Sequence, residues 1–275
     1  METKPLGHAG VRVSAVGLGT WRDRASVPVI QRALDVGATL IDTAESYGNE
    51  DDVGRAIRGR REEAFVATKV SARNHRRADL LAAAERSLRA LDIETIDLYQ
   101  LHAPSSTVPF EETFAAMDEL VRAGKVRHLG VSNFDARELA EAERILGEGR
   151  IVENQIKYSL FDHEFADTVI PFCVERGIAV MAYSTLEQGL LAERLRERPA
   201  LGPVLDGVCA ETGCTRAQVL LNWALCCEPV VVIPATSRPE RVNENAGAAG
   251  WRLSPEQYGA LTEAAGPGRS TYWWR

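Results

Sequence analysis

The sequence predicts a single-domain (β/α)8 TIM barrel over residues 1–275, with an N-terminal β-hairpin that covers the bottom and a short C-terminal extension. Eight short apolar segments alternate with longer segments of helical periodicity. Several of the short segments are apolar on both faces, as parallel strands covered on each side must be. No long linker, repeat or low-complexity segment interrupts this order. A doubly wound sheet with a second domain fits less well.

The predicted strands are short and mostly apolar, and they occupy residues 14–19, 39–42, 64–69, 95–102, 127–133, 151–155, 178–184 and 230–234. Gly7 and Gly10 precede the first of them, at the point where a hairpin would turn. We therefore expect this hairpin to close the bottom of the barrel. The segment after about residue 235 is expected to be the C-terminal extension.

The predicted helices have amphipathic periodicity and occupy residues 27–37, 77–91, 109–124, 135–149 and 215–227. Gly37 is placed to end the first helix in a left-handed conformation. Asp135 and Glu138 are spaced as in a capping box, with Asp in place of the usual Ser or Thr.

Composition excludes several classes of protein. The chain has 32 Lys and Arg against 39 Asp and Glu, a net charge of −7, which argues against a nucleic-acid partner. Its start has no apolar signal core and no run of about 18 apolar residues follows, so we expect a cytoplasmic protein without a membrane partner. The five cysteines lack metal-site spacing, and no metal site is predicted.

Polar residues stand where most of the predicted strands end, which is where barrel enzymes carry their chemistry. They are Thr20, Asp42, Lys69, His102, Ser132, Asn133, Gln155, Tyr183, Ser184 and the segment 234–236. One polar residue at a strand end often only caps a loop. A ring of them, with Asp, Lys and His on three consecutive strands, indicates an active site.

Asp42, Lys69 and His102 are expected to be neighbours on the rim, with Tyr47 in the loop after Asp42. Lys69 can neutralise Asp42, and its charge favours a phenolate, so we predict a lowered pKa for Tyr47. Such a tyrosine can give a proton to a developing alkoxide. His102 can donate a hydrogen bond to the same oxygen and orient the carbonyl.

The rest of the rim suits a nicotinamide cofactor. Ser132, Asn133 and Gln155 offer groups for a carboxamide, and Tyr183 offers a ring to stack on the nicotinamide. Residues 233–245 combine hydroxyls and arginines at a probable helix start, which suits an anion. The stretch GLGTWR lacks the third glycine of a dinucleotide fingerprint, so a Rossmann site is disfavoured.

The chain closely resembles the aldo-keto reductases from about Leu6 to Gly247. The motifs that carry the resemblance stand in family order: DTAESYGNE, ATKV, LYQLH, GKVRHLGVSNF, ENQIKYS, MAYS and IPATSRPERVNEN. The resemblance implies a (β/α)8 barrel that binds NADPH in extended form and delivers hydride to an aldehyde or ketone. It also implies that Tyr47 is the proton donor, that Lys69 and Asp42 tune it, and that His102 orients the carbonyl.

By the same resemblance, cofactor contacts are expected from Gly19, Thr20, Asp42, Ser132, Asn133, Gln155, Tyr183, Ser184, Leu186, Gln188, Ile233, Thr236, Ser237, Arg238, Arg241, Glu244 and Asn245. Ala235 stands where many members have a lysine for the 2′-phosphate. Arg238 and Arg241 can supply that charge, so NADPH is expected, with NADH as the alternative. Stretch 185–203 is short and charged, which predicts only a small loop over the cofactor.

The substrate is expected to be a small-molecule carbonyl held by His102 and Trp21, and neither its identity nor the oligomeric state is readable. Trp273 and Trp274 are further candidates for the pocket wall, although packing on the barrel is the preferred role, and Phe134 is a weaker candidate. The alternatives are a sugar or alcohol dehydrogenase running in the oxidative direction and a non-catalytic cofactor-binding barrel subunit. A metal-dependent hydrolase is disfavoured, because the five histidines supply one rim candidate.

Overall fold

The computed structural model describes residues 1–21, 25–163 and 165–268, so Trp273 and Trp274 lie outside the described residues. Eight parallel strands form the barrel wall, in the order β10-β9-β8-β7-β6-β5-β4-β3. They are β3 (Leu18–Gly19), β4 (Leu40–Asp42), β5 (Phe65–Val70), β6 (Ile96–Leu101), β7 (Val126–Ser132), β8 (Ile151–Lys157), β9 (Ala179–Tyr183) and β10 (Val230–Val232). Parallel bridges from Val16 to Val232 and from Gly19 to Ala235 join the two ends of the sheet. The predicted (β/α)8 barrel is confirmed.

The predicted hairpin is also confirmed, as the antiparallel pair β1 (Thr3–Pro5) and β2 (Arg12–Ser14). Gly7 has φ +51°, and a Cβ there would collide with the carbonyl oxygen of Val152, so glycine is required. Leu6 and Val13 pack against apolar side chains from β4, β6 and β8 to β10, together with Ala67 of β5. The hairpin therefore closes one end of the barrel, as expected.

Lys4 of β1 ties the hairpin to the barrel wall. Its side chain is buried, and its Nζ donates to four carbonyl oxygens at 2.9–3.2 Å. These carbonyls belong to Leu225, Cys227, Glu228 and Val230, at the end of one helix and the start of β10. The last carbonyls of a helix have no partner within it, so Lys4 replaces the missing donors.

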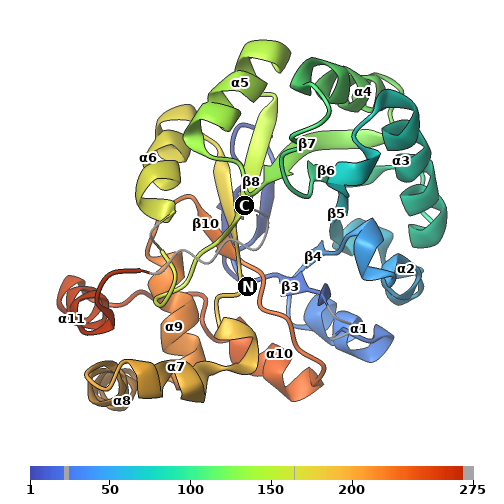
Figure 1. Ribbon diagram of the computed structural model, residues 1–275. Helices are drawn as coiled ribbons and strands as arrows, with labels where there is room; N and C mark the ends of the chain where they lie inside the picture. Colours follow the sequence, from blue (N-terminus) through green and yellow to red (C-terminus); the bar gives the residue numbers. More distant parts are fainter. Residues whose placement is uncertain (22–24, 164, 269–275) are drawn as a thin grey trace.

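Helices surround the strands (Figure 1). They are α1 (Val27–Asp35), α2 (Glu50–Ile57), α3 (Arg77–Leu91), α4 (Phe110–Arg122), α5 (Ala136–Leu146), α6 (Ala166–Arg176), α7 (Leu191–Glu197), α8 (Leu201–Thr212), α9 (Arg216–Leu225), α10 (Pro239–Ala246) and α11 (Pro255–Ala265). Short 3-10 turns lie at Glu45–Tyr47, Arg61–Glu63, Ala72–Asn74 and Glu187–Gly189. The five predicted helices are confirmed as α1, α3, α4, α5 and α9, and α3 has the predicted bounds. Asp135 and Glu138 form the predicted capping box.

Three of the helices that sequence reasoning missed, α2, α6 and α8, contain residues of low helix propensity. Gly54 lies within α2 because a Cβ there would come 2.5 Å from the carbonyl oxygen of Leu91, so the close approach of α3 requires glycine. Pro171 lies inside α6, and α8 contains Gly202, Pro203 and Gly207. At Gly54, tertiary packing overrides propensity.

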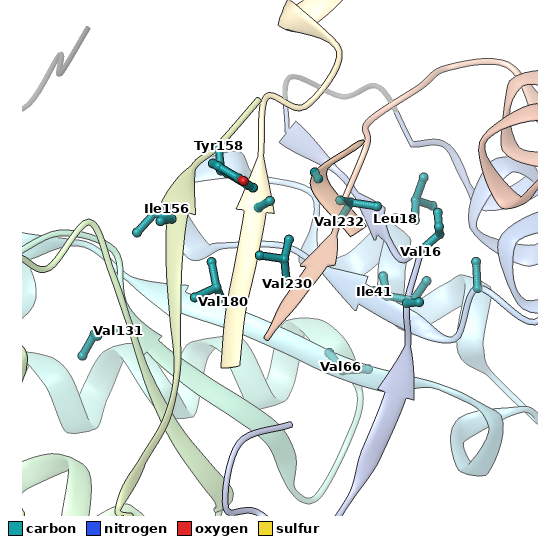
Figure 2. Packing of buried hydrophobic residues seen from close by; sticks show 14 of the residues in the cluster. Val16, Leu18, Ile41, Val66, Val131, Ile156, Tyr158, Val180, Val230 and Val232 are labelled. Carbon is teal, nitrogen blue, oxygen red and sulfur yellow. The ribbon is translucent and has the colours of Figure 1, made fainter. Parts of the chain in front are cut away.

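Two apolar layers hold the barrel together. The larger lies between the strands and the helices, and Figure 2 shows side chains of this layer from neighbouring strands, among them Val66, Val131 and Val180. The smaller fills the barrel interior and includes Leu40, Leu98 and other inward residues. Strand alternation separates the two sets, since successive side chains point to opposite faces.

One carboxyl group is enclosed in this interior. Glu153 of β8 lies opposite Gly130 of β7, and its Oε2 occupies the space that a side chain at position 130 would fill. Glu153 is fully buried, and neither oxygen has a hydrogen-bond partner among the described residues. Burial, with a further contribution from the Asp42 carboxylate, raises the pKa of Glu153 well above its ordinary value.

Glu153→Gln should make the free energy of unfolding fall less as the pH rises. Above the ordinary pKa of 4.5 the unfolded chain releases the proton of this carboxyl, whereas the folded protein retains it. Between the ordinary pKa and the raised pKa of the folded protein, the group therefore lowers the free energy of unfolding by about 1.4 kcal/mol for each pH unit. Denaturant titrations at about pH 5 and about pH 8 should show the variant gaining stability over the parent as pH rises. Glu62→Gln, at an exposed position, is the control. A Glu153→Gln difference that does not change with pH contradicts the assignment.

Candidate active site

A buried ion pair lies at the ends of β4 and β5. Lys69 Nζ is 2.7 Å from Asp42 Oδ2, and both side chains are enclosed, with exposed fractions of 0% and 3%. Lys69 also donates to the carbonyl oxygen of Thr43 at 2.9 Å. Burial acts to lower the pKa of Lys69, but Asp42 and the Tyr47 phenol act against it and the pKa is raised. The lysine is therefore charged, and the structure brings it to Asp42 as expected.

Two glutamines complete the surroundings of Asp42. Gln155 Nε2 donates to Asp42 Oδ1 at 2.8 Å and also approaches Gln100 Oε1 at 3.2 Å. Gln100 Nε2 lies 3.4 Å from the same carboxylate oxygen. The amide of Gln155, which we expected at a nicotinamide, is thus used within the protein. Gln100 was missed, although strand alternation places it on the inner face with Leu98.

Tyr47 lies beside this pair. Its Oη is 3.4 Å from Lys69 Nζ, which in turn is 5.0 Å from the centre of the phenol ring. Burial raises the pKa of Tyr47 above its ordinary value; Lys69 acts in the opposite direction, and Asp42 adds to the increase. The predicted lowering is therefore wrong, because burial outweighs the lysine charge, against which Asp42 also acts. Tyr47 is a protonated phenol at neutral pH.

The loop that carries Tyr47 is fixed on both sides by carboxylates. Glu45 Oε1 accepts the backbone N–H of Ser71 at 2.7 Å. The buried Glu50 accepts the Thr68 hydroxyl at 2.6 Å. Both partners lie on β5 or directly after it, so the loop is held against the strand that supplies Lys69. Sequence reasoning assigned no role to these two acids.

His102 follows β6 and packs with its ring edge against Tyr47, with a centroid distance of 5.6 Å and an interplanar angle of 76°. Burial, together with the Lys69 charge, lowers the pKa of His102 to about 3. The ring is therefore neutral and carries one N–H. Ser46 Oγ lies 3.4 Å from its Nδ1, a contact that sequence reasoning missed.

Three predicted cofactor residues form one hydrogen-bonded row. Tyr183 Oη donates to Asn133 Oδ1, and Asn133 Nδ2 donates to Ser132 Oγ, each at 3.0 Å. Ser132 Oγ in turn donates to the carbonyl oxygen of Gln155 at 3.0 Å. Asn133 has φ +65°, a left-handed conformation that asparagine tolerates. The row fixes the Tyr183 ring and one wall of the site.

These groups open onto a cavity of about 560 Å³. It is lined by Gly19, Trp21, Asp42, Tyr47, His102, Ser132, Asn133, Gln155, Tyr183, Ser184, Thr185, Leu186, Gln188, Gly189, Ile233, Pro234 and Ala235. The cavity is thus lined by Tyr47, His102 and eleven more of the predicted site residues. Thr20 is outside the lining, because it is fully buried with its hydroxyl 3.4 Å from Asn49 Oδ1. Phe134 is also enclosed, stacked on Phe110.

The remaining predicted cofactor residues follow the cavity along the chain. Thr236 comes directly after Ala235, and its Oγ1 accepts the backbone N–H of Arg238 at 3.2 Å. Ser237 and Arg238 lead into α10, which carries Arg241, Glu244 and the buried Asn245. Arg241 forms an ion pair with Glu244 and is half exposed. The set lies near the cavity without lining it.

Within stretch 185–203, where we expected only a small loop over the cofactor, the structure has the 3-10 turn Glu187–Gly189, α7 and the start of α8. Among residues 1–21, 25–163 and 165–268 no cluster of three or more His, Cys, Asp or Glu could hold a metal. In the same described ranges, no helix is long and apolar enough to cross a membrane.

Comparison with known proteins agrees with this geometry. The sequence profile of the Aldo/keto reductase family matches residues 15–265. Methylglyoxal reductase YeaE of Escherichia coli is 35% identical, over 96% of this chain and 95% of its own length. The solved thermostable aldo-keto reductase Tm1743 superposes with a TM-score of 0.88 at 37% identity, over 96% of this chain and 100% of that one. An aldo/keto reductase from Klebsiella pneumoniae, solved with NADP and acetate, has a TM-score of 0.88 at 32% identity and 98% coverage of both chains. The chain belongs to the aldo/keto reductase family.

Proposed function

We propose that this chain is an NADP(H)-dependent oxidoreductase that reduces an aldehyde or ketone to an alcohol, with Tyr47 as the proton donor. The observation that carries the proposal is the meeting of Asp42, Lys69, Tyr47 and His102 at one side of the cavity. These four groups come from the ends of β4, β5 and β6 and from the loop after β4. Their joint arrangement is what general acid catalysis at a carbonyl oxygen needs.

The cavity walls fit a nicotinamide. The Tyr183 ring is held by its bond to Asn133 and offers a flat apolar face. Two Klebsiella pneumoniae relatives were solved with NADP and with NADPH. A reduced nicotinamide bound here would supply the hydride.

The protein supplies the proton and the orientation. Tyr47 holds its proton at neutral pH and lies at the cavity edge, so it donates from Oη to the oxygen of the reduced carbonyl. Lys69, charged and 3.4 Å away, stabilises the phenolate that remains. In the tautomer with its proton on Nε2, His102 can accept from the Ser46 hydroxyl at Nδ1 and donate a hydrogen bond from Nε2 to the carbonyl oxygen.

The state of Tyr47 also favours one direction. A phenol that retains its proton suits reduction, whereas alcohol oxidation needs the phenolate as a base. We therefore prefer the reductase over a sugar or alcohol dehydrogenase. A non-catalytic subunit would have no need of a buried, hydrogen-bonded pair beside the phenol. A small carbonyl substrate beside Trp21 is proposed, in line with the name of the methylglyoxal reductase relative, and a cytoplasmic location remains our expectation.

Tyr47→Phe should lower the rate of aldehyde reduction by about a hundred-fold or more, because it removes the acid while retaining the ring. NADPH binding, followed by fluorescence titration, should change little. Tyr99→Phe is the matched control, since Tyr99 is fully buried and its hydroxyl has no hydrogen-bond partner among the described residues. Equal turnover by Tyr47→Phe and the parent would exclude the proton-donor role.

Arg241→Ala should weaken NADPH binding by about tenfold or more and NADH binding far less, because a charge-assisted hydrogen bond to the 2′-phosphate is lost. Dissociation constants for both nucleotides provide the test. Arg144→Ala, on an exposed site of α5, should leave both constants unchanged. If Arg241→Ala weakens both nucleotides to the same degree, the 2′-phosphate assignment is incorrect.

A further inference from the structure

The loop that covers the cavity has an unusual backbone. Ser184, Glu187 and Gln188 have φ values of +56°, +53° and +56°, in the left-handed region. Residues with a side chain rarely adopt this conformation, and a cluster of them persists only where the surroundings impose it. Leu186 and Gln188 of this loop line the cavity. Some contact must therefore hold the loop in place.

Glu187 provides that contact. Its neighbours along the chain line the cavity, but Glu187 does not, and its side chain is 3% exposed. One carboxylate oxygen accepts the Ser159 hydroxyl at 2.5 Å, and the other is 3.1 Å from Arg194 Nε. Both oxygens are thus bound on the side of the loop away from the cavity. Charge-assisted bonds of this kind are stronger than neutral ones.

The Ser159 end of the anchor is itself fixed. Ser159 lies just beyond β8 and forms an antiparallel bridge with Asp162. Its Oγ accepts the backbone N–H groups of Phe161 at 3.2 Å and Asp162 at 3.1 Å. The same strand carries Gln155, which is bonded to Asp42. Glu187 therefore ties the covering loop to the strand that also holds the buried ion pair.

Arg194 forms the second end. It lies on α7, directly after the loop, and also pairs with Glu197 at 3.2 Å. Glu187 and Glu197 differ in environment, because the Glu197 side chain is 45% exposed whereas that of Glu187 is enclosed. The chain thus offers two carboxylates on one arginine, of which only one belongs to the covering loop.

We propose that Glu187 is a positioning residue for the cofactor: its bonds to Ser159 and Arg194 hold the loop 184–189, with its three left-handed residues, in the conformation that presents Leu186 and Gln188 to a dinucleotide before it binds. The inference rests on the proposed function, in which this cavity takes NADP(H). Without the anchor the strained residues relax, and binding must then order them again, which weakens affinity.

Glu187→Ala and Ser159→Ala test the anchor from its two sides, with NADPH as the probe. Each variant should raise the dissociation constant about tenfold, mainly through faster release in stopped-flow fluorescence. At saturating NADPH the KM for a reactive aldehyde and the single-turnover rate should remain near the parent values. The double variant should bind NADPH no more weakly than the weaker-binding single variant, because both changes remove the same hydrogen bond between Ser159 and Glu187. Glu197→Gln is the control and should bind NADPH like the parent.

The proposal would be overturned if the variants are folded, as judged by circular dichroism, and bind NADPH with the parent affinity. A purely structural role would lower the melting temperature of the cofactor-free protein and leave NADPH release unchanged, which also overturns it. Ser159→Ala decides the matter if Glu187→Ala does not fold, since it leaves the Glu187 carboxylate and its bond to Arg194 in place. Failure of the parent chain itself to bind NADPH would instead contradict the proposed function.

Discussion

The enclosed ion pair between Asp42 and Lys69 is the constraint on which the rest of the site depends. Two charges removed from water are tolerated only if they are close and their remaining hydrogen-bonding groups are satisfied. Here the ammonium has Asp42 and the Thr43 carbonyl, and the second carboxylate oxygen has the Gln155 amide. These partners come from β4, β5, β8 and the residue after β4, so the site requires the barrel to be closed and in register.

The pair also explains the protonation of its neighbours. His102 is neutral because it is desolvated beside a lysine charge. A neutral imidazole can donate a hydrogen bond to the carbonyl oxygen while Tyr47 supplies the proton. Tyr47 keeps its proton because burial raises its pKa, and Asp42 acts against the influence of Lys69. The lysine therefore acts on the phenolate as it forms, while burial keeps the resting group a phenol. Glu153, enclosed below, adds no charge, since its pKa is raised well above the ordinary value.

Much of this could be predicted from the sequence, because strands, hairpin and rim residues depend on local pattern and on chain order. Asp42, Lys69 and His102 end consecutive strands, and the barrel rule places such ends together. The pKa of Tyr47 could not be predicted, since its direction depends on a balance between burial and two opposed charges. The helix α2 could not be predicted from local propensity, because Gly54 is a poor helix former and its role is close packing against α3. Glu187 sits in a charged stretch, and only the fold shows that this acid is buried.

The central claim is that Lys69, held by Asp42, makes Tyr47 a usable acid by stabilising its phenolate. An ultraviolet difference titration of Tyr47 tests it most directly, in the parent chain and in Lys69→Met, with the corresponding Tyr47→Phe proteins as references. The account predicts a higher pKa for Tyr47 in Lys69→Met, because the charge that favours the phenolate is gone while burial remains. An unchanged or lower pKa in a folded Lys69→Met protein would contradict it.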